Sequence, residues 1–409
     1  MNSKKIIAIL LTLIVLGSKV NGVTYLYNPK EKYITQNSSI STIAKENTPA
    51  FSFESQAQYL IEPTTNTVLY ANNENERLLP ASVTKVMSLL LIMEQIESGK
   101  LSYTDMIKCS EKASKMGGSQ IWFKQGEELS VEDCLKAICI VSANDCVVAM
   151  AEHIAGSEEN FVKLMNEKAK NLGMENTNFM NSHGIDEENH YTSAKDIAIM
   201  SRELIVNHPD ILKFTSIWMD SLRNGTFGLT NTNKLIRFYE GATGLKTGST
   251  SQALFNLVAT ATRNNTTFLS VVMKAPSSNI RSEESTQLLN YAFSTYEVEN
   301  IYEKNAVIED KTINKCITDN AQIAIKDDIT VLKNKGQKLE VEQNIIYNEN
   351  IVAPIKKDEI LGRIEIYNKN TKEKICEKEL ICLMDINKSN FKDYIWNLFD
   401  IFSGNKSEN

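Results

Sequence analysis

The sequence predicts an α+β protein of two domains, a larger one that mixes helices with strand hairpins and a smaller all-β one. Helical periodicity dominates between about residues 82 and 204, and β-branched strands follow between 255 and 275. From about 299 to 384 the pattern changes to short alternating strands separated by charged turns. A length of 409 residues also exceeds one ordinary domain.

The first domain opens with a predicted hairpin, "AQYLIEPTTNTVLYANN", which turns around Pro63–Asn66. The best-marked helical segment after it is "SVEDCLKAICIVSANDCVVAMAEHIAG". Ser130 and Asp133 fit a capping box there, and Gly156 fits a helix stop.

A second hairpin and a closing helix complete this domain. "FNLVATATRNNTTFLSVVMKA" predicts two strands joined at Asn264–Asn265, and "SEESTQLLNYAFSTYE" predicts a helix that ends near Glu297. The strands of the second domain include "ITVLKN", "LEVEQNII" and "LGRIEIYNK".

The tail "SNFKDYIWNLFDIFSGNKSEN" predicts an amphipathic helix. Lys392, Asp393 and Asp400 lie on its polar face. The apolar face carries Phe391, Tyr394, Ile395, Leu398, Phe399 and Phe402. Such an aromatic-rich helix suits a membrane interface, so we expect contact with a membrane surface. The alternative, packing on the β-domain, is favoured by the small number of basic residues.

The N-terminus, "MNSKKIIAILLTLIVLGSKVNG", resembles a secretory signal. Lys4 and Lys5 precede an apolar run, Ile6–Leu16, and Gly22 supplies a small residue for cleavage. The run is shorter than a membrane span, although an uncleaved anchor is the alternative. The protein is therefore expected to be exported, to the outer face of the cytoplasmic membrane or the cell wall.

Composition excludes several classes of function. A formal net charge of −7 without a basic cluster argues against nucleic acid as a partner. The seven cysteines are an odd number, and Cys134, Cys139 and Cys146 lie in apolar helical sequence typical of a core. The four histidines have no ligand-like spacing, so the sequence predicts neither a metal nor a cofactor.

The stretch "LLPASVTKVMSLLLI" places Ser82 where an apolar helix begins, with Lys85 on the same face one turn later. A helix N-terminus favours a developing negative charge, and a lysine whose pKa is lowered by burial or by another cation can act as a base. About two such Ser-x-x-Lys pairs are expected by chance in a chain of this length. Alone, the pair would indicate a helix-start serine and a solvated lysine.

Two further stretches change this interpretation. "VSANDC" contains Ser142 and Asn144, and "GLKTGSTS" contains Lys246, Thr247 and Gly248 before a β-branched strand. In this order the three motifs form the set found in penicillin-binding proteins and class A β-lactamases.

The chain resembles the low-molecular-mass penicillin-binding proteins, which are serine D-alanyl-D-alanine carboxypeptidases of the bacterial cell wall. "PASVTKVMS", "VSANDC", "NSHGIDEENHYTSAKDIAIM" and "GLKTGSTS" are similar to landmarks of their catalytic domain. "VAPIKKDEILGRIEIY" resembles their C-terminal β-domain, and an amphipathic terminal helix is their usual anchor. The resemblance implies a serine β-lactamase/transpeptidase-like domain, with an antiparallel sheet flanked by helices.

The resemblance also implies roles for individual residues. Ser82 would attack the carbonyl between the last two D-alanines of a peptidoglycan stem peptide, and Lys85 would take its proton. Lys246 would keep Lys85 neutral and supply a positive field to Ser142, which passes the proton to the leaving D-alanine. Asn144 would bind the substrate amide and help to fix Lys85.

The substrate-binding residues follow from the same comparison. The backbone N–H groups of Ser82 and Ser249 would form the oxyanion hole. Thr247, beside Gly248, would bind the terminal carboxylate, and Arg281 in "NIRSEES" would lie near it; an exposed arginine at a helix start is the alternative.

Two other positions bear on these expectations. His183 in "NSHGID" is expected to stabilise a turn, because the chemistry already has its base. The family tends to have a glycine near Leu254, and a bulky residue on a strand that edges the site is expected to affect substrate breadth and rate.

Several activities are compatible with these residues. The first is hydrolysis through an acyl-enzyme, with β-lactams as covalent inhibitors; endopeptidase or transpeptidase action is a close variant. A β-lactamase would need a Glu-x-x-Leu-Asn element, which does not occur between Ser142 and Lys246. A slow wall-binding scaffold is the remaining alternative.

The expected segments are a signal peptide at 1–22, a linker at 23–49, the catalytic domain at 50–297, the β-domain at 298–386 and the membrane helix at 387–409.

Overall fold

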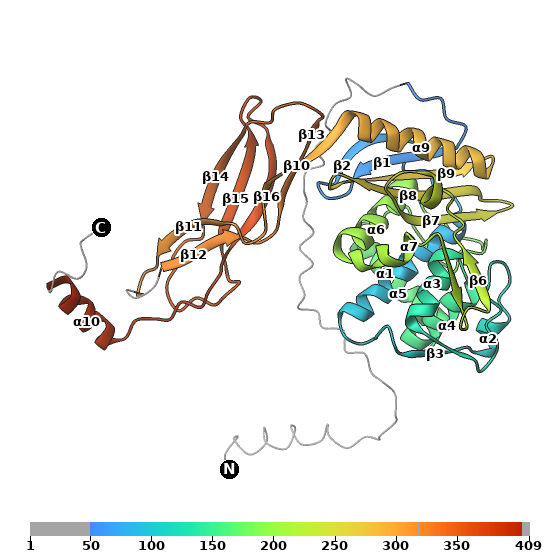
Figure 1. Cartoon of the computed structure of the whole chain (residues 1–409), viewed down its shortest axis with the longest axis horizontal. Coiled ribbons are helices and arrows are strands. Elements are labelled where there is room, and N and C mark those ends of the chain that lie inside the picture. The colour runs from blue at the N-terminus through green and yellow to red at the C-terminus, as the bar shows by residue number, and fades with distance from the viewer. Residues whose placement is uncertain (1–49, 317–319, 403–409) are drawn as a thin grey trace, which may run out of the picture. The chain divides into compact units, whose positions relative to one another are not determined.

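The computed structural model describes residues 50–316 and 320–402. The predicted signal peptide, linker and last seven residues lie outside these ranges. Figure 1 shows a domain of helices around a sheet, a β-domain and a terminal helix, which confirms the predicted fold class.

The central sheet of the first domain has five antiparallel strands in the order β2-β1-β9-β8-β7. They are β1 (Ala57–Glu62), β2 (Thr67–Asn72), β7 (Ala242–Thr250), β8 (Leu254–Arg263) and β9 (Thr266–Ala275). Both predicted hairpins are confirmed, because β1 pairs with β2 and β8 pairs with β9. Asn264 and Asn265 turn the second hairpin with positive φ, as a tight hairpin requires.

Helices cover both faces of this sheet (Figure 1). Along β9, Val271 and Met273 join the core beneath α1 (Lys85–Glu97) and α6 (Ala194–Asn207), whereas Val272 joins the core beneath α9 (Ser278–Thr295). Successive side chains of a strand point to opposite faces of the sheet. Because both faces are covered by helices, the sequence of these strands is continuously apolar.

Further helices complete this domain. They are η1 (Ala81–Thr84), α1 (Lys85–Glu97), α2 (Glu111–Ser114), α3 (Val131–Ile140), α4 (Asn144–Ala155), α5 (Glu158–Asn171), α6 (Ala194–Asn207), η2 (Pro209–Ile211), α7 (Leu212–Thr215) and α8 (Leu235–Phe238). The Ser130 side chain caps α3 through the Asp133 N–H, and Gly156 ends α4 with φ +77°, both as predicted. Cys134, Cys139 and Cys146 are buried in the core.

Short strand pairs also occur, one inside the section that the sequence predicts as mostly helical and one after it. β3 (Met106–Lys108) pairs with β4 (Glu128–Ser130), and β5 (Met219–Leu222) pairs with β6 (Phe227–Thr230). Strands of three or four residues are too short to give a periodic signal.

The second domain is all β, as predicted. A five-stranded sheet has the order β11-β12-β16-β15-β14, and β10 pairs with β13. The strands are β10 (Tyr296–Tyr302), β11 (Val307–Thr312), β12 (Asn320–Ile325), β13 (Ile329–Asn334), β14 (Val341–Tyr347), β15 (Ile360–Asn368) and β16 (Lys374–Cys382). The border expected between 297 and 298 falls inside β10, because the strand follows directly on α9.

The tail forms α10 (Phe391–Phe402). Phe391, Tyr394, Ile395 and Phe399 of the predicted apolar face are exposed, and so is Trp396. Among the described residues, no helix is long and apolar enough to cross a membrane.

Candidate active site

Ser82 lies in the short helix η1, directly before α1. Ala81 before it has φ +48°, a strained conformation for a residue with a side chain. The Asn256 side chain on β8 donates to the Leu79 carbonyl at 2.9 Å and thereby fixes the entry to η1. The sequence therefore presents the serine on a constrained turn, in line with the predicted helix start.

Lys85, the first residue of α1, is fully buried. Its Nζ lies 3.0 Å from Ser82 Oγ and 2.6 Å from the His183 carbonyl oxygen. Burial is the main cause that holds the pKa of Lys85 well below its usual value; the positive charge of Lys246 acts in the same direction, and Asp145 acts against it. The amine therefore lies beside the hydroxyl in surroundings that favour its neutral form, the form that can accept a proton.

The turn that carries His183 packs against η1. At Gly184, with φ +88°, an added Cβ would lie 1.9 Å from the Ala81 carbonyl oxygen, so only glycine permits this approach. His183 Nδ1 accepts the Ile185 N–H at 3.1 Å, and burial lowers the pKa of His183 to about 4. A neutral, turn-bound imidazole agrees with the predicted stabilising role.

Ser142 and Asn144 lie where α3 passes into α4. Ser142 has φ +64°, and its hydroxyl is buried without a hydrogen-bond partner among the described residues. The Asn144 side chain donates from Nδ2 to the Gly117 carbonyl at 2.7 Å. No hydrogen bond joins Asn144 to Lys85 among the described residues, and Asn144 Oδ1 is buried without a partner there.

Lys246 comes from β7, the edge strand of the sheet. Its side chain is almost fully buried, and burial is the main cause that lowers the pKa of Lys246 to about 7. Two residues on, a Cβ on Gly248 would meet Ser82 N at 3.0 Å and Pro80 O at 2.8 Å, so this face of β7 lies against η1. Because side chains two apart share a face, Lys246 points to the same side.

Thr247 and Arg281 complete the predicted set. Thr247 Oγ1 shares a hydrogen bond of 2.7 Å with Thr232 Oγ1. Arg281 is buried, so the alternative of an exposed helix-start arginine is wrong. Its Nη1 donates to the carbonyls of Gly248 and Asn256 at 3.2 and 3.1 Å, and burial lowers its pKa to about 10. The arginine thus supports the strand that carries Lys246 and Thr247.

Leu254 begins β8 opposite Thr250, with φ +54°. This left-handed conformation favours glycine, which is the residue expected at this position from the family resemblance. Leu254 therefore adopts the left-handed backbone conformation that suits glycine, and for a leucine this conformation is energetically unfavourable.

Three contributors were not identified from the sequence. They are Asp145, Asn256 and the backbone carbonyl of His183. Asp145 is fully buried and accepts the N–H groups of Ile121 and Phe123, both at 3.0 Å. Asp145 could have been identified from the sequence as an acidic residue next to Asn144. Asn256 and the His183 carbonyl could not, because their roles depend on contacts between distant segments.

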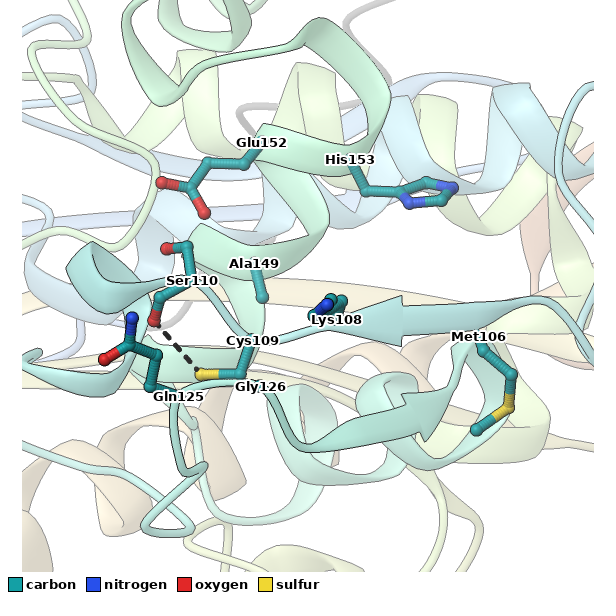
Figure 2. Close-up of a pocket in the computed structure, with 9 residues that line it drawn as sticks. All are labelled: Met106, Lys108, Cys109, Ser110, Gln125, Gly126, Ala149, Glu152 and His153. Carbon is teal, nitrogen blue, oxygen red and sulfur yellow. Dashed lines mark hydrogen bonds between the residues drawn. The ribbon is translucent and has the colours of Figure 1, made fainter.

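Two other groups lie apart from the serine. A cavity of about 690 Å³ lies beside β3 and α4, and Figure 2 shows the residues that line it. Its thiol, Cys109, has a pKa raised to about 12, mainly by burial, and is not activated. Glu94, Glu203 and His208 also gather, but the Lys168 ammonium lies 2.6 Å from Glu94 and 3.3 Å from Glu203 and balances these carboxylates.

Solved structures with the same fold were found. Penicillin-binding protein 5 from Haemophilus influenzae is 30% identical and has a TM-score of 0.69. The match covers 83% of this chain and all of that chain. Penicillin-binding protein D2 from Listeria monocytogenes, in its ampicillin-bound form, is 27% identical, with a TM-score of 0.56 and coverage of 60% and 100%. Fold and site together define a low-molecular-mass penicillin-binding protein.

The sequence comparisons give the family. The family model described as D-alanyl-D-alanine carboxypeptidase matches residues 42–277, and that of the penicillin-binding protein 5 C-terminal domain matches 296–388. D-alanyl-D-alanine carboxypeptidase DacF of Bacillus subtilis is 41% identical over 362 residues, which cover 87% of this chain and 92% of the relative. The chain belongs to the D-alanyl-D-alanine carboxypeptidase family.

Proposed function

We propose that the protein removes the terminal D-alanine from peptidoglycan stem pentapeptides through an acyl-enzyme on Ser82. Ser82 Oγ attacks the carbonyl carbon of the penultimate D-alanine, and the neutral Lys85 amine takes the hydroxyl proton. The backbone N–H groups of Ser82 and Ser249 stabilise the oxyanion. Collapse breaks the peptide bond, and D-alanine leaves after its nitrogen is protonated through Ser142. Water then hydrolyses the ester.

The remaining residues bind and orient the substrate in this proposal. β7 is an edge strand, so its outward N–H and C=O groups can pair with an extended peptide. Thr247 and the charged form of Lys246 receive the terminal carboxylate, and Arg281 acts by holding the Gly248 carbonyl. Asn144 offers Oδ1, which has no partner among the described residues, to the substrate amide.

One observation carries the proposal: Lys85 Nζ lies 3.0 Å from Ser82 Oγ and is fully buried, and this burial, together with the nearby charge of Lys246, lowers the pKa of Lys85. A surface Ser-x-x-Lys pair would keep a protonated lysine and could not activate the serine.

Covalent labelling tests this proposal. A fluorescent penicillin should acylate the purified protein, as the ampicillin-bound relative leads us to expect, and Ser82→Ala should abolish labelling. Labelling that persists in Ser82→Ala would refute the assignment of Ser82 as the nucleophile. D-alanine release from a pentapeptide should accompany labelling; labelling without release would favour transfer to an amine, endopeptidase action or a scaffold role.

We also propose that the protein is exported and that α10 rests on a membrane surface. The signal-like N-terminus and the cell-wall substrate support export. The exposed aromatic residues Phe391, Trp396 and Phe399 support the membrane contact, since aromatic side chains favour the interface.

A further inference from the structure

The turn that holds Lys85 depends on one buried carboxylate outside the motif set. Glu158, the first residue of α5, is only 6% exposed. Its Oε1 accepts the Ser182 N–H at 3.1 Å and the Ser182 hydroxyl at 2.7 Å, and His183 Nε2 lies 3.5 Å away. Its Oε2 is 2.9 Å from Lys112 Nζ. Three neighbours thus converge on a single carboxylate.

The same turn is joined to α1 on its other side. The Ser182 carbonyl accepts the Ser88 hydroxyl at 2.7 Å, and the His183 carbonyl accepts from Lys85 at 2.6 Å. Thr84 Oγ1 and His190 Nε2 lie 2.8 Å apart. The position of Lys85 beside Ser82 therefore depends on where residues 182 and 183 are held.

We propose that Glu158 is a positioning residue, which fixes the Ser182–His183 turn so that the His183 carbonyl keeps the Lys85 amine against Ser82. This rests on the proposed function and deepens it. Glu158 does not touch the reacting atoms, because its contacts are to Ser182, His183 and Lys112.

The charge on Glu158 is secured by its partners. Burial would raise the pKa of Glu158, but hydrogen bonds from Ser182 and Lys112 outweigh burial and lower it. A carboxylate with several donors is a rigid acceptor, whereas a lone buried carboxylate would not persist.

Loss of this acceptor should let water reach Lys85. Besides the hydroxyl of Ser82, the groups that face Lys85 are Lys246 from β7, Asp145 from α4 and His183 from the turn. Burial is the main cause of the low Lys85 pKa, so hydration of the amine should raise that pKa. The acid limb of acylation should then move to higher pH.

The test compares three variants in stopped-flow acylation by a fluorescent penicillin between pH 5 and 10. Glu158→Ala should slow acylation at pH 7 by about 10- to 100-fold, the order expected for a misplaced base, and should move the acid limb upward. Glu158→Gln should recover to within about 5-fold of the wild type, because its amide oxygen still accepts both Ser182 bonds. The matched control is Glu159→Gln, since the exposed Glu159 contacts the same Lys112 at 2.7 Å without touching the turn; it should stay within about 2-fold.

Thermal unfolding shows whether each variant is folded. If Glu158→Ala fails to fold, Ser182→Ala, which removes only the hydroxyl bond, should slow acylation and move the acid limb in the same direction. Equal losses in the Ala and Gln variants with an unmoved acid limb, or acylation unchanged in all variants, would overturn the positioning role. A wild type that is not acylated would instead refute the proposed function, and this inference with it.

Discussion

Lys85 and Lys246 are two buried lysines that serve different chemistry through small differences in surroundings. Lys85 has Ser82 Oγ and a carbonyl as neighbours, and its pKa falls well below the usual value. Burial lowers the pKa of Lys246 from its usual value to about 7. A base requires the neutral form of an amine and a carboxylate site the charged form; burial and the charge of Lys246 both favour the neutral form of Lys85.

This difference predicts a bell-shaped pH profile for acylation by benzylpenicillin. The rate should rise as pH passes the lowered pKa of Lys85, because only the neutral amine accepts the serine proton. It should fall above about pH 7, as Lys246 loses the charge that binds the carboxylate. In Lys246→Gln the loss of a like charge should raise the Lys85 pKa, so the acid limb should move to higher pH.

The control for this profile is Lys108→Gln, an exposed lysine of β3 at the cavity in Figure 2. Its acid limb should match that of the wild type. An acid limb in Lys246→Gln that stays in place, or moves to lower pH, would show that Lys246 does not act on Lys85.

The sequence predicted the side chains at the centre of the site better than their supports. Ser82, Lys85 and Lys246 lie in short motifs with fixed spacing and could be predicted. The His183 carbonyl and Asn256 could not, because a backbone group has no sequence signature and Asn256 acts on a residue 177 positions away. The role of Asn144 in fixing Lys85 stays a prediction from the resemblance, since its Nδ2 donates to Gly117 while its Oδ1 has no partner among the described residues.

At the scale of elements, the site is made by close backbone approaches between η1, β7 and the turn at residues 181–185. The sequence predicted the helices and hairpins because their periods extend over several turns or pairs. It could not predict β3 and β5, which are too short, or the packing of Gly184 against Ala81, which joins segments far apart in the chain.

We predict that Gly184→Ala destabilises the fold by about 2–4 kcal/mol, from its left-handed φ together with the collision at Ala81. Acylation should also fall, because the collision pushes against the residue before Ser82. Urea unfolding measures the first effect and penicillin labelling the second.

Gly225 supplies the matched control. Its φ is +86°, close to the +88° of Gly184, but an added Cβ would meet no atom within 4 Å. Gly225→Ala should therefore cost only about 1 kcal/mol, the conformational part alone, and leave labelling intact. Similar losses in both variants would mean that the approach of Gly184 to Ala81 is unimportant.

At the scale of the whole molecule, the net charge of the tail determines which forces could bind α10 to a membrane surface. Residues 387–409 contain three lysines and three carboxylates, so their formal net charge is zero. Attraction to anionic lipids would then contribute little, and burial of the exposed aromatic side chains would supply the affinity. The sequence predicted this helix from its amphipathic period, although the wheel did not place the exposed Trp396 on the apolar face.

Deletion of residues 390–409 should therefore move the mature protein from the membrane to the soluble fraction while penicillin labelling is retained. Replacement of Phe391, Trp396 and Phe399 by serine should have the same effect, because these side chains provide the apolar contact. Binding of the intact protein to vesicles should persist in 1 M salt and be lost in detergent, since apolar burial does not depend on ionic screening. Co-sedimentation with neutral and anionic vesicles measures both results. Release by salt alone would assign the contact to charge, and an unchanged distribution after deletion would exclude α10 as the anchor.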